Sequence, residues 1–112
     1  MSKDNAARIS LRALRREVTG GNYALGPHAM QHAVKEEFTV ADVVQVVLTG
    51  VLVEEYPSRR RCLLYADVTI EGVKLPLHVV CEQWSPESPV AIVTAYIPSE
   101  NEWITPTRRK RR

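Results

Sequence analysis

The chain has 112 residues, the size of one domain, and can bury an apolar core without disulfides or a metal. Its longest apolar run, around residues 43–53, is interrupted by Gln45, Thr49 and Gly50, so we expect no membrane span. The first residues lack the apolar core of a secretion signal, and we therefore expect a cytoplasmic protein.

The net charge of +2 is unevenly distributed along the chain. Residues 108–112 supply five of the fifteen Lys and Arg side chains, so the rest carries ten cations against thirteen acids, a net charge of −3. The basic tail, residues 105–112, is expected to be a disordered, solvated terminus. The alternative is that Arg108, Arg109 and Lys110 bind nucleic acid phosphates or an acidic partner.

The N-terminal quarter predicts a basic amphipathic helix. From Ala6 to Val18 apolar residues recur at helical spacing and arginines populate the other faces, and a Gly-rich loop completes this segment, residues 1–24. We expect these arginines to form a solvated helix face, and the alternative is that Arg12 and Arg16 contact nucleic acid.

Two further helices are expected before residue 51. Pro27 suits the first turn of a helix that runs to about Glu37. Thr39 and Asp42 form the pattern of a capping box for the next helix, and Gly50 is a natural place for it to stop.

The strongest periodic signal is a β-hairpin of residues 61–70 and 73–82. Apolar residues alternate along both runs, and only Glu71 and Gly72 separate them. A tight turn there predicts Cys62 opposite Cys81 on the buried face and Tyr65 beside His78 on the other face. We expect the two cysteines to be reduced core thiols rather than a strained disulfide.

Two more strands complete the predicted sheet. Residues 51–56 should pair with the hairpin so that Tyr56 faces Arg61, Val53 faces Leu64 and Val51 faces Ala66. The last strand, residues 90–97, has two largely apolar faces, so its register stays open: one choice puts Thr94 and Tyr96 near His78, and the other reverses them. The predicted fold is α+β, with two or three helices packed on one face of a four-stranded antiparallel sheet.

A metal site is not predicted. His28 and His32 are four residues apart on a helix, a spacing that lets two imidazoles reach one ion. The sequence offers no obvious third ligand, and Gly-rich phosphate loops and nucleophile motifs are absent as well, so we predict no cofactor.

Metal-independent RNA cleavage is compatible with the side chains present. It needs a base for the ribose 2′-hydroxyl, an acid for the leaving oxygen, and cations for the transition state. The candidate acid–base and hydrogen-bonding residues are His28, His32, His78, Tyr65, Thr94 and Tyr96. A hydrogen-bonded structural role for His78 is the competing interpretation, and Trp84 and Trp103 are interpreted as packing or loop anchors.

Several segments in a fixed order resemble a bacterial domain-of-unknown-function family, number 4258. The matching segments are His28-Ala29, residues 38–43, Gly50 with residues 53–57, residues 77–80, residues 92–96, Pro98 and Trp103. The resemblance covers about residues 25–104 and implies that these residues form the family's α+β domain.

That family is similar to the RelE/ParE and BrnT toxins of bacterial toxin–antitoxin pairs. The resemblance implies a RelE/BrnT-like fold, RNA as a candidate ligand and an antitoxin-like protein as a candidate partner. The chain departs from the family at His32 and Glu36, where arginines are expected, which removes two cations from a phosphate-binding side.

Two hypotheses for function follow. The first is a toxin-like domain that binds or cleaves RNA, with the histidines as acid–base groups and the arginines holding phosphates. The second is a non-enzymatic interaction module whose sheet edge or basic helix binds a protein partner. Self-association is compatible with both.

Overall fold

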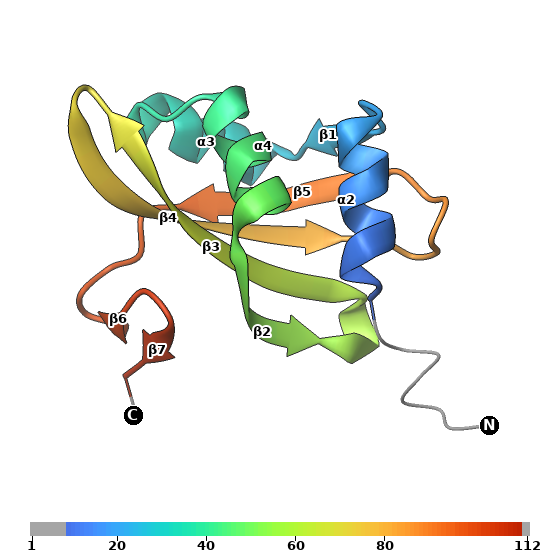
Figure 1. Ribbon diagram of the computed structural model, residues 1–112. Helices are drawn as coiled ribbons and strands as arrows, with labels where there is room; N and C mark the ends of the chain where they lie inside the picture. Colours follow the sequence, from blue (N-terminus) through green and yellow to red (C-terminus); the bar gives the residue numbers. More distant parts are fainter. Residues whose placement is uncertain (1–8, 111–112) are drawn as a thin grey trace.

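The computed structural model describes residues 9–110 (Figure 1). The described elements are α2 (Leu11–Thr19), β1 (Tyr23–Leu25), α3 (Pro27–Glu36), α4 (Val40–Thr49), β2 (Val51–Tyr56), the 3-10 turn η1 (Pro57–Arg59), β3 (Arg61–Ile70), β4 (Val73–Glu82), β5 (Val90–Tyr96), β6 (Trp103–Thr105) and β7 (Arg108–Arg109). The predictions for residues 1–8 and 111–112 lie outside the described residues. The first described helix is α2, whose N-cap Ser10 accepts a hydrogen bond from the Ala13 backbone N–H.

The main sheet has five strands in the order β1-β5-β4-β3-β2 and is mixed. The prediction of four antiparallel strands was wrong because Tyr23–Leu25, expected in the Gly-rich loop, forms β1 and pairs parallel to β5. Gly26 extends this contact by donating its N–H to the Ile92 carbonyl at 2.9 Å. Three residues are too few for a periodic signal, and their partner lies far away in the sequence.

The central hairpin is confirmed over its whole length. Cys62 pairs with Cys81 and Tyr65 with His78, as the alternation predicts. Positive φ angles at Glu71 and Gly72, 50° and 81°, give the tight turn that fixes this register. Both cysteines are buried free thiols, and burial raises the pKa of Cys62 to about 12, which keeps the thiol protonated at neutral pH.

A β-bulge at Val93 settles the register of β5. Val80 pairs with Thr94 and Cys81 pairs with Ile92, so Val93 is the extra residue. The bulge changes the alternation, so Ala95 and Ile92 are both buried while Thr94 lies on the opposite face. The choice that places Thr94 and Tyr96 on the face of His78 is therefore the one observed, since Tyr96 pairs with His78.

A second bulge corrects the predicted register of β2. Tyr56 faces Arg61 as expected, but Leu52 rather than Val53 faces Leu64, and Val51 faces Tyr65. The extra residue is Val53, inserted in a strand that has no second neighbour among the described strands of the sheet. Bulges are common on such edge strands, and the hydrophobic pattern alone does not reveal them.

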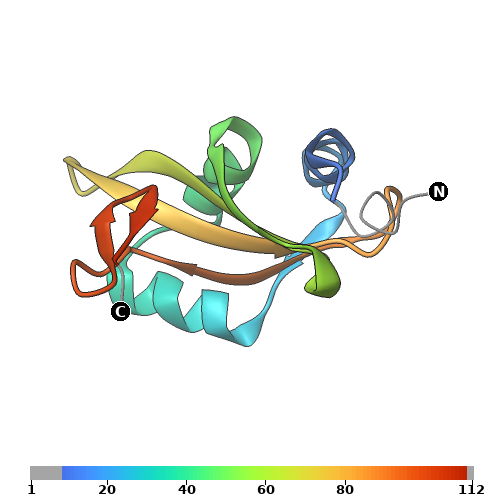
Figure 2. The same cartoon turned by 90° about the horizontal axis from the view of Figure 1, so that it is seen from below.

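The helices divide between the two sides of the sheet. Figure 2 shows α2 and α4 on one side, while α3 runs along β5 on the other. The prediction that all the helices share one face therefore holds for two of the three described helices. α4 has the predicted capping box of Thr39 and Asp42, and ends before Gly50. Gly50 is required there because a Cβ would lie 2.4 Å from the Val46 carbonyl oxygen.

The core lies between the sheet and the pair α2 and α4. Its fully buried members include Leu14, Val43, Val46, Val47, Leu64, Leu77, Val79 and Ile92. α2 is fastened to α4 by Arg15, whose guanidinium donates to the carbonyls of Val47 and Gly50 at 2.8 and 2.6 Å. Among the described helices, none has the length and apolar character needed to cross a bilayer.

The C-terminal residues form a small hairpin rather than an irregular tail. Trp103–Thr105 and Arg108–Arg109 pair as a separate two-stranded sheet, β6–β7. The hairpin lies against the face of the main sheet that α2 and α4 leave uncovered. Its residues show no alternation long enough to predict strands from the sequence.

Candidate functional site

An aromatic row crosses the polar face of the main sheet. Tyr65 on β3, His78 on β4 and Tyr96 on β5 are directly paired across neighbouring strands. Ring centroids are 6.1 Å apart for Tyr65 and His78, and 5.4 Å apart for His78 and Tyr96. Three of the six candidate residues from the sequence are thus brought together by the register of the sheet.

The C-terminal hairpin covers the middle of this row. The Trp103 ring stands edge-on to His78, with centroids 4.5 Å apart and planes at 90°. The Pro106 carbonyl oxygen lies 2.6 Å from His78 Nε2, so Nε2 carries the proton and donates it. His78 is 0% exposed and Trp103 is 4% exposed. The interpretation of Trp103 as an anchor is confirmed, and His78 is closed off from solvent.

An ion pair holds the far end of the hairpin. Arg109 donates from Nε and Nη2 to the Glu54 carboxylate at 3.2 and 2.9 Å, and its guanidinium carbon lies 4.4 Å from the Trp103 ring centroid. The Tyr56 hydroxyl donates to the same carboxylate. The hydrogen bonds from Arg109 keep the pKa of Glu54 below its usual range, so this carboxylate is ionised at neutral pH.

His78 is a neutral, structural imidazole in this closed arrangement. Burial lowers its pKa and the nearby Arg109 adds to that effect, while the Pro106 hydrogen bond and Glu54 act in the opposite direction. Nδ1 faces the Tyr96 hydroxyl at 3.4 Å. Both ring nitrogens are therefore occupied by protein groups, and no substrate atom reaches them while the hairpin is closed.

The two other histidines lie on α3. His32 bonds Glu36 through Nδ1 at 2.9 Å, and its ring lies 6.4 Å from the Tyr96 ring, at the edge of the aromatic row. His28 is one turn earlier and is exposed. Within residues 9–110, no three His, Cys, Asp or Glu side chains gather as a metal site would require.

An open groove lies on the same polar face, beyond the aromatic row. It has a volume of about 420 Å³ and is lined by Tyr56, Ser58, Arg59, Arg61, Val80, Val93 and Thr94. Thr94 is the only predicted site residue among those that line it. Arg61 is paired with Glu82 at 2.7 Å, whereas Arg59 is exposed and forms no ion pair within the described chain.

The cations of this groove were not predicted as site residues. Arg59, Arg60 and Arg61 form a consecutive run, in which Arg59 and Arg60 were interpreted as turn residues and Arg61 as the first residue of the next strand. The run could have been noticed as a charge cluster beside the end of a strand. Its contribution to a groove depends on the bulge at Val93, which the sequence does not reveal.

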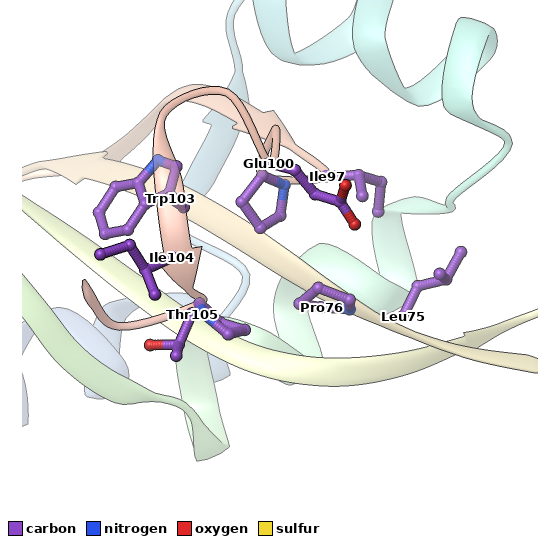
Figure 3. Close-up of a pocket in the computed structure, with 9 residues that line it drawn as sticks. Leu75, Pro76, Ile97, Glu100, Trp103, Ile104 and Thr105 are labelled. Atoms are coloured by element: carbon purple, nitrogen blue, oxygen red, sulfur yellow. The ribbon is translucent and has the colours of Figure 1, made fainter. Parts of the chain in front are cut away.

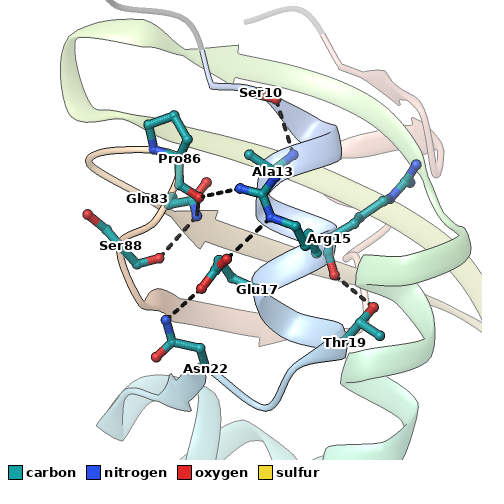
Figure 4. Close-up of polar contacts among 10 residues, drawn as sticks. Ser10, Ala13, Arg15, Glu17, Thr19, Asn22, Gln83, Pro86 and Ser88 are labelled. Atoms are coloured by element: carbon teal, nitrogen blue, oxygen red, sulfur yellow. Dashed lines mark hydrogen bonds and ion pairs between the residues drawn. The ribbon is translucent and has the colours of Figure 1, made fainter.

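The predicted nucleic acid contacts fall into two separated sets. Arg12 and Arg16 lie on α2, where Arg16 pairs with Glu17 at 3.5 Å and donates to the Pro86 carbonyl at 3.2 Å (Figure 4). Arg108, Arg109 and Lys110 lie on or beside β7, at the other end of the molecule (Figure 1). The structure does not bring these sets onto one surface, and Arg109 is engaged with Glu54.

The loop between β4 and β5 closes the end nearest α2. The buried Gln83 donates to the carbonyls of Pro86 and Ser88 at 3.2 and 3.0 Å. Asn22 donates to Glu17 at 2.8 Å just before β1 (Figure 4). The two hydrogen bonds of Gln83 account for its burial as a structural residue of the loop. We therefore assign this loop no part in the site.

The fold and the site define a class of small α+β proteins. A mixed sheet packs one face on α2 and α4 and carries on the other face α3, a cationic groove, and an aromatic row covered by the C-terminal hairpin. The family model named domain of unknown function (DUF4258) matches residues 25–97, and the chain belongs to this family. No curated protein and no solved structure gives a match. The matched region holds the row and the groove, while α2 and the hairpin β6–β7 lie outside it.

Proposed function

We propose that this protein is a toxin-like RNA-binding domain that holds single-stranded RNA on the polar face of its sheet. The observation that carries the proposal is the groove lined by the exposed Arg59 and by Arg61 together with the apolar side chains of Val80 and Val93. Cationic grooves with hydroxyl donors suit phosphates, and their apolar floors suit bases. The RelE/BrnT-like fold and an antitoxin-like protein partner are parts of this proposal.

Binding is better supported than cleavage. RNA cleavage without a metal needs an accessible base and acid, and His78 is enclosed by Trp103, Pro106 and Tyr96. The groove itself is lined by arginine, hydroxyl and apolar side chains. We therefore expect wild-type protein to bind RNA and leave it intact in the presence of EDTA.

The test is a fluorescence anisotropy titration of a labelled 12-nucleotide single-stranded RNA. Arg59→Gln should weaken binding by about fivefold, or about 1 kcal/mol, because one phosphate contact is lost. The matched control is Lys74→Gln, which removes the same charge from an exposed site at the opposite end of β4. Arg59→Gln binding as tightly as Lys74→Gln would contradict the proposal, as would a wild-type protein that binds no RNA.

A protein-interaction module is the second candidate, and the free edge of β2 favours it. This strand pairs on one side with β3 and exposes Val51 and Leu52. An extended segment of a partner could add a strand there. Co-expression with the product of a neighbouring reading frame should yield a complex that Leu52→Lys weakens. A complex unaffected by this change would exclude the β2 edge.

A further inference from the structure

The C-terminal hairpin, residues 99–110, is a self-contained unit. Its backbone bonds are largely internal: Trp103 N–H donates to the Ser99 carbonyl at 3.0 Å, and Lys110 N–H donates to the Glu102 carbonyl. Its two strands form their own sheet and add no strand to the main one. The hairpin can therefore move as one piece without breaking the ladder of the main sheet.

The polar and ring contacts between the hairpin and the body include the Trp103 ring against His78, the Pro106 carbonyl on His78 Nε2, and the ion pair of Arg109 with Glu54. Beside these contacts, a crevice of about 280 Å³ separates the hairpin from the ends of β4 and β5, between Trp103 and Pro76 (Figure 3). The hairpin thus packs on the sheet through the buried Trp103 and leaves a crevice beside it.

The closed position leaves one polar group unsatisfied. Trp103 Nε1–H is buried and has no acceptor in the described part of the chain. A buried donor without an acceptor has lost its hydrogen bond to water, which weakens the closed state. The other Trp, Trp84, is exposed and donates its Nε1–H to Glu82 at 2.9 Å.

We propose that this hairpin is a displaceable lid and that the surface beneath it, Tyr65, His78 and Tyr96, binds a base of the RNA. The inference rests on the proposed RNA-binding function. In the closed state the lid supplies what a base would supply: an aromatic ring against His78, and a carbonyl oxygen that accepts the Nε2 proton. A nucleotide can replace both contacts when its base packs against the His78 ring and a separate oxygen of the RNA accepts the hydrogen bond from Nε2–H.

The aromatic row lies next to the groove, so one RNA strand can occupy both. Val80 and Thr94, which line the groove, form the next pair on the same face, two residues along β4 and β5 from the pair of His78 and Tyr96. An extended RNA with phosphates at Arg59 would run from the groove onto the aromatic row. The lid and the RNA therefore compete for the row but not for the groove.

The first experiment opens the lid at its ion pair. In a Trp84→Phe background Trp103 is the one tryptophan left, so acrylamide quenching of its fluorescence reports lid opening. Arg109→Gln should increase quenching because the open state, with the hairpin displaced from His78, becomes more populated. Since this open state is the one that binds the base, RNA binding should tighten by about three- to tenfold even though the variant has lost a cation. The matched control is Arg108→Gln, which removes the neighbouring exposed cation and should leave quenching unchanged without tightening binding.

A second pair of variants removes an acid instead. Glu54→Gln breaks the same ion pair, while Glu55→Gln neutralises an exposed carboxylate next to it. Glu54→Gln should increase both the quenching of Trp103 and the affinity for RNA. Glu55→Gln should leave the quenching unchanged and alter the affinity for RNA only through the lost negative charge. Agreement between the two pairs of variants would separate lid opening from simple electrostatics.

The outcomes distinguish this inference from the proposed function. If RNA saturates the protein through Arg59 while Trp103 stays protected, the lid is refuted and the groove stands. If Arg109→Gln exposes Trp103 but does not tighten binding, the base site is refuted. If neither wild-type protein nor any opened variant binds RNA, the function and the base site both fail.

Discussion

The two faces of the main sheet are covered in different ways. The face toward α2 and α4 is sealed by a continuous set of apolar side chains, with Leu64 and Val79 fully buried at its centre. The opposite face carries polar and aromatic side chains and is covered over His78 by a separate hairpin. The first face holds the fold together, and the second is where the chain can exchange an internal contact for a ligand.

The largest loss of stability is expected from a substitution on the face covered by α2 and α4. Leu64→Ala should lower the free energy of unfolding by about 2–5 kcal/mol, because a fully buried leucine leaves a cavity that its neighbours fill only in part. Urea unfolding followed by circular dichroism measures this. Val73→Ala, at an exposed position, is the control and should change stability by less than about 0.5 kcal/mol. Similar losses for the two variants would contradict the assigned core.

A smaller loss of stability is expected from a substitution in the hairpin that covers the opposite face. Trp103→Ala removes a larger side chain than Leu64→Ala, yet it should cost only about 1–2 kcal/mol of global stability, because the loss is limited to the docking of the hairpin. Urea unfolding and hydrogen exchange of β3 and β4 check this. A loss as large as that of Leu64→Ala would show that both faces belong to one cooperative core.

Acidification should reduce the free energy of unfolding through His78, which lies on the polar face. Burial lowers the pKa of His78 in the folded protein, while a histidine in the unfolded chain titrates near about 6.5. Below that pH the unfolded state binds more protons, so stability is full above about pH 6.5 and falls as the pH drops toward the folded-state pKa. Arg109 strengthens this effect, and Glu54 and the Pro106 carbonyl reduce it.

Unfolding in urea at about pH 7.5 and 5.5 measures the difference. His78→Gln should show a smaller loss than the wild type on acidification. An unchanged pH dependence in His78→Gln would remove His78 as its cause.

The smallest effect on stability is expected from the ion pair. Arg109 and Glu54 are partly exposed, so Arg109→Gln should change the free energy of unfolding by less than about 1 kcal/mol. Thermal unfolding of this variant beside Arg108→Gln checks the claim. A larger loss from Arg109→Gln would mean that the ion pair stabilises the whole fold and not the closed hairpin alone.

The sequence predicted the parts of the fold that depend on local pattern. The alternation through Tyr65 and His78 and the Glu71-Gly72 turn fixed the central register, and Thr39 and Asp42 marked the start of α4. β1 was missed because three residues carry no period, and Val53 and Val93 shifted the outer strands because a bulge leaves no signal in composition.

The site was predictable only where it lies on the central strands. Tyr65, His78 and Tyr96 came together because cross-strand pairs follow from register. The cover over His78 depends on one tryptophan, one carbonyl and one ion pair far along the chain, and no periodicity connects them. For the same reason Arg59 and Arg61 were not predicted as site residues: Arg59 was assigned to a turn and Arg61 to the start of a strand, and a groove exists only once the strands have been placed.

The most direct measurement is the indole N–H signal of Trp103 in a ¹H–¹⁵N spectrum of uniformly labelled protein during titration with single-stranded RNA. Comparison with the Trp84→Phe variant assigns the signal, because the chain has two tryptophans. Saturating RNA should shift the Trp103 signal and expose its proton to exchange with water, as the hairpin leaves His78. Saturable RNA binding that leaves this signal unshifted and protected would contradict the account.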